Sequence, residues 1–148
     1  MKKNEFQRLL LAALVAFSLD SAAGQNSLTL TVFVEGAKAD VGQAIASLFS
    51  SSDNYLKAPI SEKTFPIDDE GRARIVFKNL KAGTYSVSIV YDENSDGKMN
   101  TGLFGIPSEL VGFSNNVKGV FGPPSFNKTS FSLPESDSIS IILNQAKE

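Results

Sequence analysis

Oxygen-bearing side chains are concentrated in one short segment of the chain, residues 92–100, which reads D-E-N-S-D-G-K-M-N. Asp92, Asn94 and Asp96 place side-chain oxygens at every second position, and Gly97 follows where a tight loop must turn. Hard cations such as calcium take several oxygen ligands, and this spacing lets one short loop wrap them around an ion. The segment, called the Asp92 loop below, therefore predicts a weak calcium site.

The rest of the expected ligand shell is less regular. Lys98 would contribute its backbone carbonyl, because an ammonium group cannot ligate a cation, and Asn100 would ligate directly or through water. Leu103 stands where an EF-hand carries its closing glutamate, which excludes that type of site, and Glu109 is a nearby carboxylate that can complete the shell. The alternative is a solvated turn, since Asp, Asn, Ser and Gly are the residues that turns prefer.

A second group of residues combines aromatic rings with side-chain amides. Rings stack on apolar faces and amides set orientation, so this combination predicts a surface for an unknown protein or glycan partner. The alternative is that the rings fill one end of the fold while the amides bond loop backbone. The residues of this expected surface are Phe113, Asn115, Asn116, Phe121 and Phe126.

The composition leaves little room for catalysis. The chain contains no His and no Cys, which excludes thiol nucleophiles, Ser-His relays and ordinary zinc sites. Asp92, Glu93, Asp96 and Glu109 are the carboxylates available for a paired-carboxylate hydrolase. Roles as ligands or turn formers explain their close spacing better. We therefore predict a non-enzymatic binding module, with a structural or assembly subunit of the cell envelope and a carboxylate-dependent hydrolase as alternatives.

The start of the chain predicts an export signal over residues 1–24. Basic residues precede a short apolar run at 9–17, and small residues allow cleavage after Ala23 or Gly24. The run is shorter than the roughly twenty residues needed to span a bilayer. Cleavage leaves one domain, residues 25–148, in a secreted or periplasmic protein with no stable membrane insertion.

The charge balance argues against nucleic acid as a partner. The whole chain has 14 basic and 16 acidic residues. The expected signal removes three basic and two acidic residues, so the mature chain has a net charge of −3. Nucleic-acid partners call for a basic surface instead.

Alternating apolar residues predict short strands through most of the mature chain. Residues 41–49 fit either a helix or a strand, and their surroundings favour a strand. Residues 101–125 are rich in Gly and Pro and predict a long loop. The pattern predicts an all-β antiparallel sandwich of about seven strands, immunoglobulin-like or transthyretin-like, with a closed barrel as alternative. The remaining expected strands are 28–34, 63–67, 72–77, 85–91, 126–133 and 138–143.

Two sets of motifs resemble known families. The phrase L-K-A-G-T-Y at residues 80–85 is similar to a corner of transthyretin-like and carboxypeptidase-regulatory-type sandwiches. A longer series resembles a bacterial secreted family catalogued as domain of unknown function 2141. This resemblance implies an export signal and a β-sandwich, and no established activity. The family often has a His just before the acidic loop, where this chain has Tyr91. The segments of the series are 83–100, 105–109, 112–116 and 121–126.

Overall fold

The computed structural model describes residues 27–120 and 122–146. The expected export signal and Phe121 of the expected ligand surface lie outside these residues. Within the described part, no helix is long and apolar enough to cross a bilayer. Its strands are β1 (Leu28–Glu35), β2 (Gln43–Phe49), β3 (Ser61–Pro66), β4 (Arg72–Leu80), β5 (Gly83–Asp92), β6 (Leu110–Phe113), β7 (Phe131–Leu133), β8 (Ser138–Ile142) and β9 (Asn144–Gln145). Its short helices are η1 (Leu103–Gly105), η2 (Ser114–Asn116) and α1 (Phe126–Thr129).

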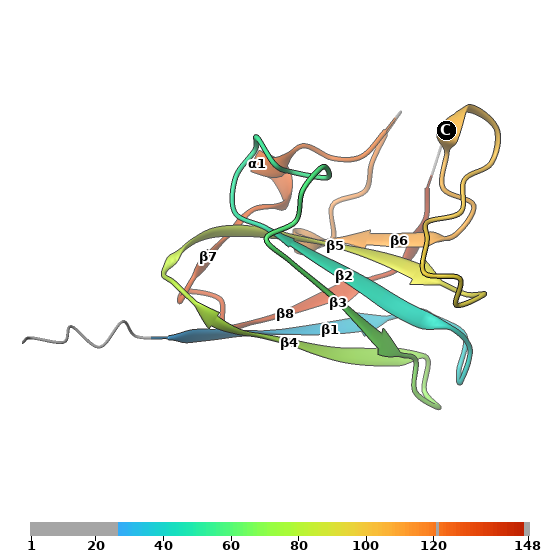
Figure 1. Cartoon of the computed structure of the whole chain (residues 1–148), viewed down its shortest axis with the longest axis horizontal. Coiled ribbons are helices and arrows are strands. Elements are labelled where there is room, and N and C mark those ends of the chain that lie inside the picture. The colour runs from blue at the N-terminus through green and yellow to red at the C-terminus, as the bar shows by residue number, and fades with distance from the viewer. Residues whose placement is uncertain (1–26, 121, 147–148) are drawn as a thin grey trace, which may run out of the picture.

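Two sheets form a β-sandwich, which confirms the predicted fold class (Figure 1). The three-stranded sheet has the order β4-β1-β8, and β1 pairs antiparallel with β4 but parallel with β8. The six-stranded sheet has the order β3-β2-β5-β6-β9, with β7 paired to the beginning of β5. β5 is the central strand of the larger sheet, so the loop that follows it starts from the best-anchored part of the fold.

Alternation along the strands places apolar side chains between the two sheets. Leu30, Val32 and Val34 of β1 are fully buried, as the sequence pattern predicts. Ala44, Ala46 and Leu48 are fully buried from β2, which settles the ambiguous segment 41–49 as a strand there. Burial of apolar area at about 25 cal/mol per Å² is the main stabilising contribution. Beside β2 in the same sheet, β5 contributes Val87, Ile89 and Tyr91 to this core.

The corner at residues 80–85 is held by a side-chain hydrogen bond. The hydroxyl of the buried Tyr85 donates to the backbone carbonyl of Lys81 at 2.9 Å. A tyrosine that bonds backbone a few residues upstream is a recurring corner of β-sandwiches. The resemblance drawn from this phrase therefore corresponds to a real structural device at the start of β5.

Two expected boundaries differ from the structure. Residues 101–125 are not one long loop, because β6 and two short helices form inside them. Residues 126–133 are not one strand: they form α1 and then β7. In α1 the hydroxyl of Thr129 bonds the carbonyl of Phe126 at 3.1 Å, so a local side-chain bond supports the helical turn. Within the described residues this gives nine strands where the pattern predicts about seven.

Gly112 explains how β6 fits against the smaller sheet. A Cβ atom at this position would lie 2.5 Å from Cγ2 of Ile141, a buried residue of β8. Such a distance is too short for any real side chain, so only glycine lets β6 pass this close to β8. The close approach joins the two sheets on the side where β6 and β9 lie.

Candidate functional site

Asp92 ends β5 with a carboxylate that is fully buried. Its Oδ2 accepts hydrogen bonds from Nε2 of Gln43 at 2.7 Å and from the backbone amide of Gly97 at 2.8 Å. Its Oδ1 accepts from the amide of Asp96 at 3.1 Å. Burial alone would raise the pKa of Asp92, but hydrogen bonds from Gln43 and from the backbone of residues 95–97 hold it below the ordinary value of 3.8. The charged carboxylate of Asp92 therefore holds the loop in its conformation through these hydrogen bonds.

The other expected ligands bond mostly within the loop. Oδ1 of Asn94 accepts from the amide of Asp96 at 3.2 Å, and Oδ1 of Asp96 accepts from the amide of Lys98 at 2.9 Å. Asn100 offers its carbonyl to the amide of Ser108 at 2.9 Å. Over residues 27–120 and 122–146, no group of three or more acidic side chains is arranged to hold a metal ion. The calcium site stays a prediction of the sequence.

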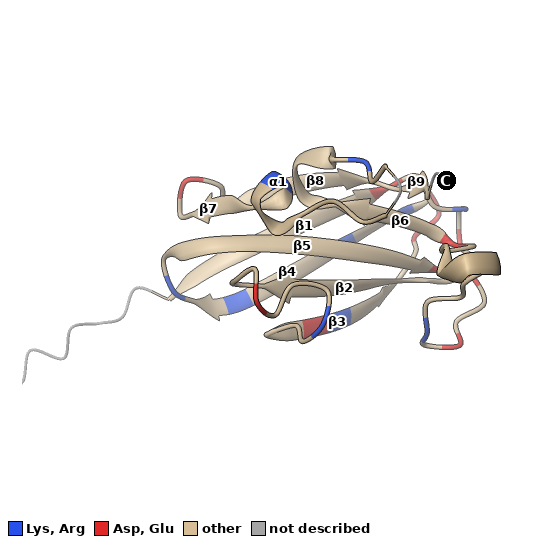
Figure 2. Ribbon diagram, turned by 90° about the horizontal axis from the view of Figure 1, so that it is seen from above, with Lys and Arg blue, Asp and Glu red and all other residues tan. Residues whose placement is uncertain are grey.

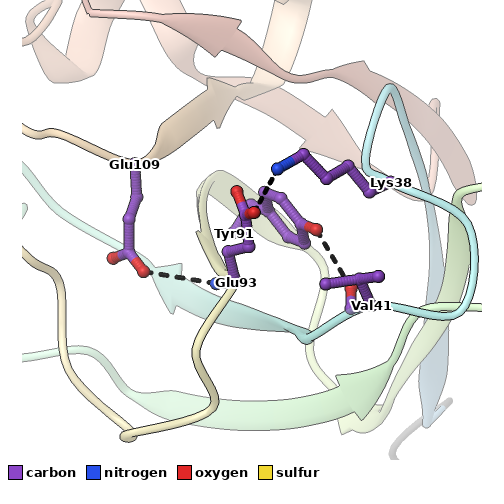
Figure 3. Close-up of polar contacts among 5 residues, drawn as sticks. All are labelled: Lys38, Val41, Tyr91, Glu93 and Glu109. Atoms are coloured by element: carbon purple, nitrogen blue, oxygen red, sulfur yellow. Dashed lines mark hydrogen bonds and ion pairs between the residues drawn. The ribbon is translucent and has the colours of Figure 1, made fainter.

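Glu109 ties the two ends of the Asp92 loop together, and Figure 3 shows its bond to one of them, at Glu93. One carboxylate oxygen accepts from the amide of Glu93 at 3.2 Å, and the other accepts from the amide of Asn100 at 2.9 Å. Glu93 also pairs with the ammonium group of Lys38, on the loop before β2. The carboxylate of Glu109, placed near the loop by sequence distance alone, thus lies directly against it.

Tyr91 immediately precedes Asp92 on β5. Its ring is buried in the core, and its hydroxyl donates to the carbonyl of Val41 at 3.0 Å (Figure 3). The next residue along, Gly42, has φ +71°, and a Cβ there would lie 2.5 Å from the carbonyl oxygen of Asp92. The turn before β2 and the end of β5 are therefore packed backbone to backbone.

A hairpin-like loop follows the Asp92 loop and displays apolar side chains at its tip. Thr101 and Pro107 form a β-bridge at its base, and Gly102 donates to the carbonyl of Ile106 at 2.7 Å. Leu103 and Phe104 at the tip are 83% and 96% exposed. Phe104 has φ +60°, an unfavourable backbone conformation for a bulky residue.

A cavity of about 1010 Å³, called the sheet groove below, lies over the outer face of the six-stranded sheet. The sheet provides its floor, and side chains from the hairpin-like loop and from Val117, Lys118 and Pro123 line its walls. In Figure 2, which looks on to this face, β2, β5 and β6 are free of charged residues along nearly their whole length. Mostly apolar cavities of this size are typical of ligand sites. Its apolar lining includes Phe49, Val90, Met99, Phe104, Ile106, Val111, Phe113, Val117 and Ile142.

The expected ligand surface is divided by the structure. Phe113 and Asn116 line the sheet groove. Asn115 instead uses its amide nitrogen to bond the carbonyls of Lys128 and Ser130, at 3.1 and 2.9 Å. Asn115 thereby holds α1 against η2.

Phe126 belongs to the packing beneath α1. Its ring packs edge-on against Tyr55, with ring centroids 5.7 Å apart. Beside the rings, the hydroxyl of Thr129 lies 2.8 Å from the hydroxyl of Ser86 and 3.3 Å from that of Tyr55. Burial raises the pKa of Tyr55, against smaller opposing effects of its hydroxyl neighbours. This buried hydroxyl cluster anchors α1 to β5.

Asn116 has a structural contact as well as a place in the groove. Its amide nitrogen donates to the carbonyl of Ser140 at 3.1 Å, and its amide oxygen accepts from the backbone of Ile142 at 2.8 Å. The side chain thus pairs with β8 as the backbone of a neighbouring strand would.

Several residues of the site were not identified from the sequence. Gln43 follows a turn and gives no sign that it will meet Asp92, because the contact depends on β2–β5 register. Gly102 and Gly105 indicate a turn around Phe104, but the sequence does not show that the ring is exposed there. Met99 sits inside the Asp92 loop but faces the groove.

The fold and the groove define a class: a small all-β sandwich with a loop-walled apolar groove on one sheet. Residues 32–141 match the family described as an uncharacterized protein conserved in bacteria, DUF2141. The match spans well over half of the chain, so the chain belongs to this family, as its motifs predicted. No curated protein and no solved structure that was compared matches it.

Proposed function

We propose that this protein is an exported binding module that holds an apolar ligand in the sheet groove. The observation that carries the proposal is the groove itself, about 1010 Å³ in volume and lined mainly by apolar side chains. Large apolar surfaces left open on a small domain usually mark sites of interaction. Export is supported by the signal pattern of residues 1–24.

The Asp92 loop acts in this proposal as a brace for one wall of the groove. Its own bonds and those of Glu109 fix Asn100, from which the hairpin-like loop rises. Phe104 and Ile106 of that loop line the groove. A weakly held calcium ion would stiffen the brace further, and the alternating oxygens of Asp92, Asn94 and Asp96 support that part of the proposal.

Binding of a neutral apolar dye tests the proposal. N-phenyl-1-naphthylamine fluoresces strongly only in apolar surroundings, and we expect saturable enhancement by the mature protein. Val111→Glu places a charge in the groove and should abolish the enhancement. Val76→Glu is the matched control, since Val76 is a half-buried valine on β4 outside the groove lining.

Two results would refute groove binding: no dye enhancement by the folded protein, or equal enhancement by Val111→Glu. Circular dichroism of each variant establishes that the sandwich is intact. A folded protein without dye binding would favour the alternative of a structural or assembly subunit of the cell envelope.

A further inference from the structure

The polar side chains of the sheet groove are unevenly available to a ligand. Asn116 bonds β8 through both its amide nitrogen and its amide oxygen, and Asn144 donates its amide to the carbonyl of Ile142 at 2.7 Å. The carboxylate of Glu62 accepts a hydrogen bond from the hydroxyl of Ser47 at 2.8 Å. These amide and carboxylate groups, which could otherwise orient a sugar, are therefore already bonded within the protein.

A peptide ligand adding to the floor as a strand is also disfavoured. Val90 of β5 lies between Ile45 of β2 and Val111 of β6, so the backbone of β5 is paired on both sides there. An extended peptide cannot join a sheet through a central strand, because recognition of that kind needs an open edge. The floor of the groove therefore offers a ligand mainly apolar contact.

Two lysines are the positively charged residues of the groove lining. Lys57 comes from the segment between β2 and β3, and Lys118 follows η2, so two different walls each bring an ammonium group to the groove. Both residues are exposed, and neither forms an ion pair with any acid in the described part of the chain. With Glu62, the charged side chains of the lining sum to +1.

We propose that the ligand of the sheet groove is a single-chain amphiphile with an anionic headgroup, such as a fatty acid. Its apolar chain lies on the floor formed by β2, β5 and β6, and its headgroup meets Lys57 or Lys118 at the rim. The inference rests on the proposed function and adds the chemical class of the ligand.

Displacement of the bound dye tests the headgroup preference. We expect submicellar dodecanoate to displace N-phenyl-1-naphthylamine with at least about tenfold higher affinity than dodecyltrimethylammonium, because the alkyl chains are of similar length and the headgroups carry opposite charges. The double variant Lys57→Gln/Lys118→Gln should lose most of that preference while still binding the neutral dye. Lys78→Gln/Lys81→Gln is the control with the same change of net charge at exposed sites outside the groove lining.

Equal displacement by the two amphiphiles would overturn the inference, and so would the same loss of preference in the control variant. In either case dye binding itself would persist, so the proposed function would stand. Failure of the dye to bind at all would reject both. Displacement by a neutral oligosaccharide or by an apolar peptide, without displacement by dodecanoate, would assign the groove to a different ligand class.

Discussion

Nε2 of Gln43 lies 2.7 Å from Oδ2 of Asp92, and the two residues are also direct partners in the pairing of β2 with β5. The bond joins the first residue of one strand to the last residue of the other. It therefore couples the pairing of the central strands to the conformation of the Asp92 loop. A loop that depends on strand register is expected to respond to changes at either residue.

Asp92→Asn should destabilise the protein by about 2–3 kcal/mol, because a buried charged acceptor of several hydrogen bonds is replaced by an amide. Urea denaturation measures the change. Asp96→Asn is the control, since Asp96 is exposed and its backbone amide still bonds Asp92. Equal losses for the two variants would contradict the organising role of Asp92.

The lowered pKa of Asp92 gives this contribution a pH dependence with a definite sign. The folded pKa lies below the ordinary value of 3.8, so the contribution is complete above that value and is lost as the pH falls through the folded pKa. The stability difference between wild type and Asp92→Asn should therefore stay constant from pH 6 down to about pH 4 and shrink as the pH falls from there to about pH 2. A difference that stays constant across this range would argue against a charged Asp92.

Calcium should raise the melting temperature if the Asp92 loop holds the ion predicted from the sequence. The affinity expected for such a loop is about 10⁻⁴ to 10⁻³ M, so the shift should appear at millimolar calcium. Asp96→Ala should abolish the shift while leaving the buried bonds of Asp92 in place. The absence of any calcium-dependent shift in the wild type would reject the site.

Gly112→Ala should destabilise the protein by about 1–3 kcal/mol through overpacking against Ile141. Gly102→Ala is the matched control, because Gly102 has a negative φ and an added Cβ would only reach ordinary contact with Ile106. We expect its unfolding free energy to stay within about 0.5 kcal/mol of wild type. Thermal unfolding of both variants checks the comparison, and a harmless Gly112→Ala would show that β6 can move away from β8.

Asn116→Gly should raise hydrogen exchange at the backbone amide of Ile142, which donates to the Asn116 side chain. Glycine accommodates the left-handed conformation that Asn116 adopts, with φ +52°, so the backbone can keep its conformation when the side-chain bonds are removed. The expected loss of stability is about 1–2 kcal/mol for two hydrogen bonds. Unchanged exchange at Ile142 would show that β8 is protected by other means.

The strands that could be predicted are those with strong alternation. The pattern from Leu28 to Val34 and from Tyr85 to Tyr91 follows directly from burial of one face, and both segments are strands. β6 has only four residues, one of them Gly112, so it carries no period long enough to recognise. The helical turn at 126–129 depends on a hydroxyl bond of Thr129 that the apolar pattern does not contain.

The candidate site also has one part that the sequence indicates and one part that only the folded structure shows. The Asp92 loop could be located because its residue types and spacing are local, and Glu109 follows Asn100 by nine residues. The sheet groove could not, because it joins side chains such as Phe49, Val111 and Ile142 from distant segments. Whether an amide such as Asn116 is available to a ligand depends on which backbone it meets, and that is decided by tertiary packing.

The side chain of Asn116 also bears on how the protein behaves at high concentration. β8 pairs with β1 along one edge. On its other edge, the side chain of Asn116 bonds the carbonyl of Ser140 and the amide of Ile142. Open strand edges recruit strands from other molecules and start aggregation. We therefore expect Asn116 to limit the pairing of β8 with strands of other molecules, because its removal would free backbone groups on an edge that carries Ile139, Ile141 and Ile142.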